Sequence, residues 1–270
     1  MRKNDPLPAT TPAIRSQMAP PHIGLLIAFT TRGTALTGPQ DLLFFRYTIP
    51  TFLNNRCRSR LTFYLGYDHD DPYFQEHPEA AAQLSQLLHK TLAAAPLGLA
   101  VDYQLHCVQN PSRSNPCYVW NSLAARAVQD GCEYLYQLGD DISFQCDYWD
   151  QWYLRVLQSH DNLGVTGCYT SQYNIITQLF LHRRHLEIFG SLFPPAFKNW
   201  ASDRWVNHVY APEYVYPIHP TLFSGTNNLL ATGPVQRYEI DEAGLAAAEG
   251  LIQEGRQLLQ RYLATSAPKK

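Results

Sequence analysis

Residues 22–138 alternate between four short apolar segments and three longer segments with helical spacing, and this order constrains the fold more than any other feature of the chain. The apolar runs have the length of buried strands. A β-α-β-α-β-α-β order needs crossover connections, which give a parallel sheet covered by helices on both faces. We expect strands at 22–29, 60–66, 100–108 and 132–138, and helices at 41–54, 79–95 and 116–130.

The rest of the chain is less regular, but it still contains recognisable elements. The expected helices are 148–158 and 184–193, the expected strands are 163–169 and 174–181, and Asp241 opens a last helix. Two prolines bear on the helices of the first half. Asn115 caps the helix that Pro116 begins, whereas Pro50 must end or kink the helix at 41–54.

No linker-like stretch interrupts residues 21–265, so we expect one Rossmann-like α/β domain there, with a mostly parallel central sheet and helices on both faces. It divides into a front half at 21–147, a back half at 148–240 and a C-terminal helix at 241–264. Residues 1–20 are rich in proline and lack a core-forming pattern, which predicts a disordered tail.

Charge and cysteine usage exclude several classes of protein. The net charge is −2, which argues against a nucleic-acid or membrane-surface binder because both need a positive field. No apolar run reaches about 18 residues, so we expect no membrane span. The 6 cysteines form no CxxC pair, which argues against structural zinc and predicts reduced thiols and a cytoplasmic location.

Polar clusters follow three of the four front-half strands. In open parallel sheets, ligands bind beyond the carboxyl ends of the strands. We therefore expect the clusters to converge and to place several carboxylates beside one arginine. The clusters are Thr30, Thr31 and Arg32 after the first strand, Asp68, Asp70 and Asp71 after the second, and Asp140 and Asp141 after the fourth.

The Asp140–Asp141 pair is the most informative of these clusters. Mg²⁺ and Mn²⁺ prefer carboxylate oxygens and commonly keep substrate phosphate oxygens as further ligands. Both carboxylates can reach one ion only if the strand has already turned, which Gly139 permits. The pair lies between two apolar segments, where charge is costly unless a cation neutralises it. The alternative is an ordinary acidic turn.

The other candidates at this edge each have two readings. Asp68 and Asp71 either accept hydrogen bonds from a ribose or a base, or belong to a solvated turn before Pro72. Arg32 binds phosphate or pairs with a nearby aspartate. Asn121 lies off the apolar stripe of its helix, so it is a contact to a nucleotide or a surface residue.

Two candidates lie in the back half of the chain. Asp203 is surrounded by bulky aromatic residues, which favour a raised pKa and general-base work on a hydroxyl. Asp203 can also cap the helix that begins near Arg204. His219, between two prolines, is either a third metal ligand or a structural residue.

Taken in order, these motifs resemble the nucleotide-sugar half of GT-A-fold glycosyltransferases. The resemblance is carried by the strand ending at Thr30–Arg32, the acidic turn 67–71, Trp120–Asn121, and Gly139-Asp140-Asp141 in place of a DxD motif. The segment 178–205 resembles the acceptor part of that family. Residues 21–147 would then form the nucleotide-sugar half and 148–240 the acceptor half.

The resemblance implies a hexosyl- or pentosyltransferase that uses a UDP- or GDP-sugar and acts on a hydroxyl of a glycan or another acceptor. It implies Mn²⁺ or Mg²⁺ held chiefly by Asp141, with Asp140 on the metal or the ribose and His219 as a further ligand. Asp203 would be the catalytic base, giving inversion at the anomeric carbon. If Asp203 only binds the acceptor, a retaining route opens.

Three other functions are compatible with parts of the pattern. A nucleotidyltransferase would have a glycine-rich basic loop after the first strand, and Thr30–Gly33 is too short for one. A non-catalytic carbohydrate-binding protein would use the abundant aromatic residues for stacking, with structural carboxylates. A metal-dependent hydrolase would need a fuller set of His and Asp ligands.

Overall fold

The computed structural model describes residues 19–93, 101–113, 115–170, 174–218, 226–228 and 240–266. Residues 1–18, which make up most of the predicted tail, lie outside this part of the chain, and so does His219. All 6 cysteines are free thiols. Among the described helices, none combines the length and the apolar character that crossing a bilayer would require.

The centre of the fold is a sheet in the order β3-β2-β1-β4-β8-β6-β7, with β9 paired to β6. The pairs β1–β2, β2–β3, β1–β4 and β6–β9 are parallel, which confirms the mostly parallel sheet expected from the sequence. A second, two-stranded sheet pairs β5 with β10. The strands are β1 (His22–Ala28), β2 (Arg60–Asp68), β3 (Val101–Val108), β4 (Tyr134–Leu138), β5 (Ile142–Phe144), β6 (Val165–Thr170), β7 (Ile175–Ile176), β8 (Phe180–His182), β9 (Val215–Ile218) and β10 (Thr226–Asn228).

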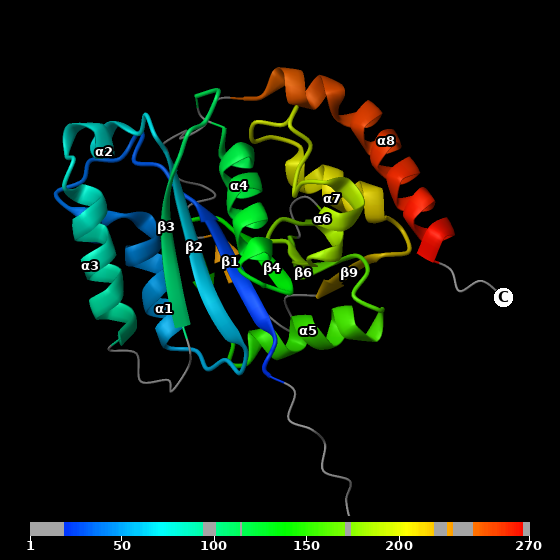
Figure 1. Ribbon diagram of the computed structural model, residues 1–270, viewed down its shortest axis with the longest axis horizontal. Coiled ribbons are helices and arrows are strands. Elements are labelled where there is room, and N and C mark those ends of the chain that lie inside the picture. Colours follow the sequence, from blue (N-terminus) through cyan, green and yellow to red (C-terminus); the bar gives the residue numbers. More distant parts are fainter. Residues whose placement is uncertain are drawn as a thin grey trace, which may run out of the picture.

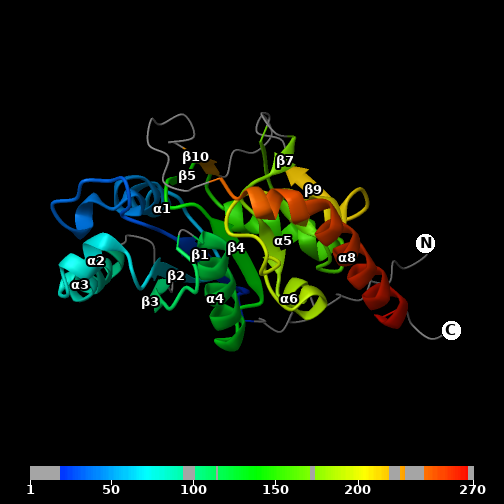
Figure 2. The same ribbon diagram turned by 90° about the horizontal axis from the view of Figure 1, so that it is seen from above.

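Helices cover both faces of the sheet, as Figure 1 and Figure 2 show, which confirms the predicted layering. One face packs against α1, α3 and α5, and the other against α4, α6, α7 and α8. The helical segments are η1 (Pro39–Asp41), η2 (Phe44–Thr48), α1 (Ile49–Leu53), α2 (Pro72–Glu76), α3 (Ala80–Ala93), α4 (Pro116–Gln129), α5 (Trp149–Ser159), α6 (Arg184–Phe189), α7 (Ser202–Tyr210) and α8 (Glu242–Ser266).

Strand β1 is buried on both faces, which explains its continuous apolar sequence. Two glycines let α4 approach the sheet closely. A Cβ on Gly66 would lie 2.6 Å from Cγ1 of Val119, and one on Gly24 would lie 3.0 Å from Cβ of Ala127. The close contact fixes the N-terminus of α4 beside the carboxyl ends of β1 and β2.

Helix α4 begins as the sequence predicts, because Oδ1 of Asn115 accepts the backbone N–H of Tyr118 at 3.0 Å. The expected helix at 41–54 is wrong in kind. The segment consists of a 3-10 turn, a π-helical segment and then α1. Pro50 lies in the first turn of α1, where a backbone N–H has no partner within the helix, so the lack of this group in proline costs no hydrogen bond.

The expected strand at 174–181 is also wrong, because it divides into β7 and β8. Strand β7 pairs with the far end of β6, whereas β8 pairs with both β4 and β6. The acidic turn at 67–71 is shorter than the sequence suggested. Tyr67 and Asp68 still belong to β2, so the turn proper contains only His69 and Asp70.

Candidate functional site

The direction of the sheet topology changes between β1 and β4, because β2 and β3 lie on one side of β1 and β4 on the other. Ligands of open α/β sheets bind beyond the carboxyl strand ends at such a point. The segments 30–32 and 139–141 follow β1 and β4 directly, and Ile27 pairs with Leu138 in the register. Both predicted segments therefore lie at the carboxyl ends of neighbouring strands, on the edge of the sheet seen from above in Figure 2.

Asp71 joins the first strand end to the second. Its buried carboxylate accepts the backbone N–H of Thr31 and the hydroxyl of Thr30, each at 2.9 Å, as well as the hydroxyl of Thr31. These donors satisfy a charge that would otherwise be costly to bury. The three residues are brought together as predicted, but their side chains are bonded to one another and so fix the loop after β1.

Arg32 extends from this loop to the end of β2. Its guanidinium donates from Nη1 to Asp68 at 3.3 Å and from Nη2 to Asp70 at 2.6 Å, while its buried Nε has no hydrogen-bond partner among the described residues. The predicted alternative, pairing with aspartate, is therefore the arrangement observed. Arg32 still carries a free donor beside two carboxylates, at the edge where the strands end.

The two carboxylates on Arg32 differ in their environments. Burial raises the pKa of Asp68, although hydrogen bonds from Asn110 and Arg32 oppose this effect. Burial also acts on Asp70, but the hydrogen bond and charge of Arg32 outweigh it and lower the pKa of Asp70. Both are held in defined positions, which a recognition site requires.

Asp140 and Asp141 form the turn between β4 and β5 and are both buried, with 3% and 4% of their surface exposed. The hydroxyl of Thr48 donates to the carbonyl of Asp140 at 3.3 Å and fixes the turn. A Cβ on residue 139 would lie 3.0 Å from Oδ1 of Asp141, so glycine leaves room for this carboxylate to fold back. Two buried, adjacent carboxylates are an oxygen donor set suited to Mg²⁺ or Mn²⁺.

Within the described ranges, no three His, Cys, Asp or Glu side chains gather as a metal site would require. Mg²⁺ is nevertheless commonly bound by one or two protein carboxylates, and substrate phosphates complete its coordination shell. Asp140 and Asp141 therefore fit such an ion, and the predicted third ligand, His219, lies outside the described residues.

Asn121 lies in α4 and is bonded to the back half of the chain. Its amide nitrogen donates to the carbonyl of Phe193 at 2.9 Å, and its amide oxygen accepts the backbone N–H of Phe193 at 2.8 Å. Both ends of the amide are therefore bonded to one buried residue of the back half. Asn121 ties α4 to the segment after α6, an arrangement that neither of its two sequence interpretations, nucleotide contact or surface residue, had included.

Replacing Asn121 with alanine is expected to lower the free energy of unfolding by about 1–3 kcal/mol, because the Phe193 N–H loses its acceptor, although the Phe193 carbonyl keeps the Ser191 hydroxyl. Chemical denaturation measures this value. Ser122→Ala is the matched control, since Ser122 only donates to the Tyr118 carbonyl within its own helix. Equal stability of the two variants would contradict the role given to Asn121.

Asp203 lies in the first turn of α7, where its Oδ1 accepts the backbone N–H of Arg204 at 2.7 Å. The helix begins at Ser202, two residues earlier than expected, so Ala201 is the N-terminal cap and Asp203 bonds inside the first turn. Burial raises the pKa of Asp203, and backbone hydrogen bonds oppose the shift. The raised pKa agrees with the environment inferred from its aromatic neighbours.

A chain of contacts connects the Asp203 segment with the strand ends. Asn110 donates from Nδ2 to Asp68 at 2.6 Å and to the carbonyl of Asn115 at 2.9 Å. Two residues further on, the backbone N–H of Cys117 donates to the carbonyl of Lys198 at 3.0 Å. The front-half carboxylates and the segment before α7 therefore meet at the N-terminus of α4.

Asn110 is the residue of this site that the sequence reading missed. It follows the carboxyl end of β3, so the rule applied to the other three strands would have found it. Its neighbour in the chain, Pro111, made the segment look like an ordinary loop. The Asn110 side chain positions Asp68 and also bonds the backbone carbonyl of Asn115, the residue that caps α4.

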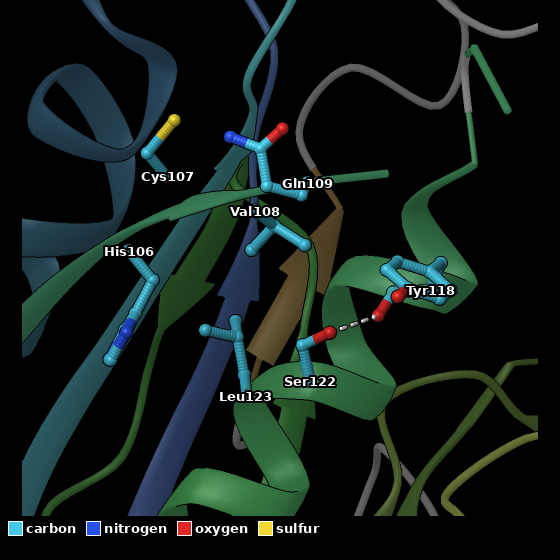
Figure 3. Close-up of a pocket in the computed structure, with 7 residues that line it drawn as sticks. All are labelled: His106, Cys107, Val108, Gln109, Tyr118, Ser122 and Leu123. Carbon is cyan, nitrogen blue, oxygen red and sulfur yellow. Dashed lines mark hydrogen bonds between the residues drawn. The ribbon is translucent and has the colours of Figure 1, made fainter. Parts of the chain in front are cut away.

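Two cavities lie outside the candidate site. One, of about 270 Å³, opens between β3 and α4, and Figure 3 shows His106, Val108 and Leu123 among its lining side chains. Another, of about 600 Å³, lies where α5, β9 and α8 meet and includes Tyr216 and Tyr262. Neither is lined by a residue that the sequence singled out for the site.

No family model matches the sequence, and no curated protein matches it. The crystal structure of S. aureus TarS matches 90% of this chain with a TM-score of 0.54 at 10% identity, and the chain spans 43% of that TarS chain. The structure of S. aureus TarS 1-349 in complex with UDP matches 91% of this chain with a TM-score of 0.50 at 9% identity, over 72% of its own length. At this identity the likeness concerns the fold, which is similar to a glycosyltransferase fold.

Proposed function

We propose that this protein is a glycosyltransferase that moves a sugar from a nucleotide-diphosphate sugar, with UDP or GDP as the nucleotide, to an acceptor hydroxyl. The observation that carries the proposal is the buried Asp140–Asp141 turn at the carboxyl end of β4. The similar fold of TarS, which has been solved in complex with UDP, supports it. The transferred group is a hexose or a pentose.

Asp140 and Asp141 would hold Mn²⁺ or Mg²⁺, with Asp141 as the chief ligand and Asp140 on the metal or the ribose. When bound, the ion offsets the negative charge that grows on the leaving diphosphate. The burial of both residues at the carboxyl end of β4 supports this assignment, because carboxylate oxygens are the ligands that these ions prefer.

The end of β2 would receive the nucleoside. Asp68 and the amide oxygen of Asn110, which also accepts the backbone N–H of Ser112, keep further lone pairs, so together they can recognise the hydroxyls of a ribose or the edge of a base. The Nε of Arg32, which has no partner in the part of the chain that the structure describes, is a donor for a phosphate oxygen. Asp71, Thr30 and Thr31 act by holding the loop that carries Arg32.

Asp203 would be the base. It takes the proton of the acceptor hydroxyl as the acceptor oxygen bonds to the anomeric carbon, and the bond from that carbon to the diphosphate oxygen breaks. The products are the glycoside and a free nucleoside diphosphate, with inversion at the anomeric carbon. The raised pKa of Asp203 suits this work, because a carboxylate with a higher pKa is a stronger base.

A thermal-shift panel of UDP- and GDP-sugars, with and without Mn²⁺, tests the proposal. A ligand that binds only the folded state at 100 times its Kd adds about 2.7 kcal/mol of stability, a shift of several degrees. We expect one donor to raise Tm with Mn²⁺ present, and glucose 1-phosphate, which lacks the nucleotide, to have no effect. A flat panel would contradict the proposal, and binding without transfer to any acceptor would indicate a carbohydrate-binding protein.

A further inference from the structure

We propose that Trp200 is the stacking platform of an acceptor subsite, on which a pyranose ring rests with one hydroxyl directed to Asp203. This inference depends on the proposed function and names the acceptor class for the same site. Trp200 lies three residues before Asp203 and leaves 49% of its surface exposed. An indole is the largest apolar surface a side chain offers, and its flat face suits the C–H face of a sugar ring.

The segment that carries Trp200 is held firmly in place. The backbone carbonyl of Lys198 accepts the N–H of Cys117 at 3.0 Å. The backbone N–H of Lys198 donates to the carboxylate of the buried Asp241 at 2.7 Å. The hydroxyl of Ser202 donates to the carbonyl of Asn199 at 2.9 Å. Trp200 is therefore exposed on a fixed segment between α4, α7 and the start of α8.

The backbone beside Trp200 adopts a conformation that costs energy. Ala201 has a φ of 67°, in the left-handed region that residues with a Cβ rarely occupy, and its side chain is buried. The strained turn places Trp200 on the solvent side and Asp203 in the first turn of α7. Strain of this kind persists where the surrounding structure enforces it, and it is common at binding sites.

The subsite would also lie next to the donor. Asn115, which caps α4, is bonded to Asn110, and Asn110 is bonded to Asp68 at the end of β2. Two residues along α4, Cys117 contacts the Trp200 segment, and the pKa of its thiol is raised by burial and by the Asp203 and Asp241 carboxylates. Acceptor and donor would thus meet across the N-terminus of α4.

Trp152 provides a matched control. It is 48% exposed, almost the same as Trp200, but it lies on α5. Helix α5 is tied to the amino end of β2, since Asp150 accepts the N–H of Ser59 at 2.9 Å. Figure 1 shows α5 at the opposite end of the sheet from the N-terminus of α4. The two tryptophans therefore differ in place and not in exposure.

Intrinsic fluorescence provides a readout that does not depend on turnover. With UDP and Mn²⁺ present, the probes are the methyl β-pyranosides of glucose, galactose and N-acetylglucosamine, with sorbitol as an open-chain polyol. We expect one pyranoside to shift the emission to shorter wavelength in the wild type and in Trp152→Ala, but not in Trp200→Ala. Sorbitol should cause no shift. Loss of the shift in both variants, its persistence in Trp200→Ala or an equal effect of sorbitol would overturn the inference.

Transfer kinetics give the second measurement. Trp200→Ala should raise the acceptor KM roughly 10- to 30-fold, and Trp200→Phe should restore most of the loss because a ring face remains. The Tm increase caused by UDP and Mn²⁺ should be the same in wild type and variant. If that increase is absent from the wild type, the proposed function fails. If it is present and Trp200→Ala transfers with an unchanged KM, only the Trp200 subsite fails.

Discussion

Replacing Asp203 with asparagine is expected to lower kcat by about 10²- to 10⁴-fold, the range that general-base catalysis contributes. Asparagine keeps the size of the side chain and the oxygen that accepts the Arg204 N–H, so helix α7 remains. Only the ability to take a proton is lost. Single-turnover transfer with saturating donor and acceptor measures the chemical step.

The same substitution has an effect on stability with a defined sign. Burial raises the pKa of Asp203 in the folded protein above its usual value of 3.8, so the charged form costs folding energy. This cost is absent below the unfolded pKa and is complete above the folded pKa. Asp203→Asn is therefore expected to be more stable than the wild type at neutral pH, with the difference disappearing in acid.

Two further observations complete the test of Asp203. The kcat of the wild type should fall as pH decreases through the raised pKa, and this limb should be missing from Asp203→Asn. Glu242→Gln is the control, because Glu242 is an exposed acidic residue in the first turn of α8. Full activity of Asp203→Asn would rule out the base, and inactivity combined with lower stability would indicate a structural role.

Replacing Asp141 with asparagine is expected to reduce metal-assisted turnover by at least about 10²-fold, because the ion supplies several kcal/mol to the departing diphosphate. The Tm increase caused by Mn²⁺ together with the donor should be lost. The fold should persist, since asparagine has nearly the same size and shape as aspartate. Steady-state rates across a Mn²⁺ titration provide the measurement.

Asp147→Asn is the control for Asp141→Asn. Asp147 follows Asp141 closely in the sequence and forms an exposed ion pair with Arg56, so its replacement removes the same charge outside the candidate site. It should leave the Mn²⁺ dependence of the rate intact. The metal assignment is contradicted if Asp141→Asn has the same half-saturating Mn²⁺ concentration as the wild type.

Local sequence signals predicted the front half of the fold well. The apolar runs became the parallel strands β1 to β4, and the Asn115–Pro116 pair begins α4 with the cap that was expected. These signals succeed because strand burial and helix capping depend on residues close together in the chain. The convergence of polar clusters at one sheet edge follows from parallel topology alone.

The details of the site depend on contacts between distant residues, which no local pattern encodes. The carboxylate of Asp71 accepts hydrogen bonds from Thr30 and Thr31, about 40 positions away in the sequence. The amide of Asn121 donates to the carbonyl of Phe193, 72 positions away. A residue that lies off the apolar stripe of a helix looks the same in sequence whether it faces a ligand or another segment. The division of 174–181 into β7 and β8 also depends on distant residues, because β7 pairs with β6 whereas β8 pairs with β4.

We expect the carboxyl end of the sheet to bind an activated sugar through a cation at Asp140 and Asp141. Crystals soaked with Mn²⁺ and the donor that stabilises the protein most test it directly, because manganese scatters anomalously. We predict an anomalous peak within coordination distance of Asp141, with the diphosphate on the ion and the nucleoside beside Asp68. A peak located elsewhere, or a donor bound away from these strand ends, would contradict the account.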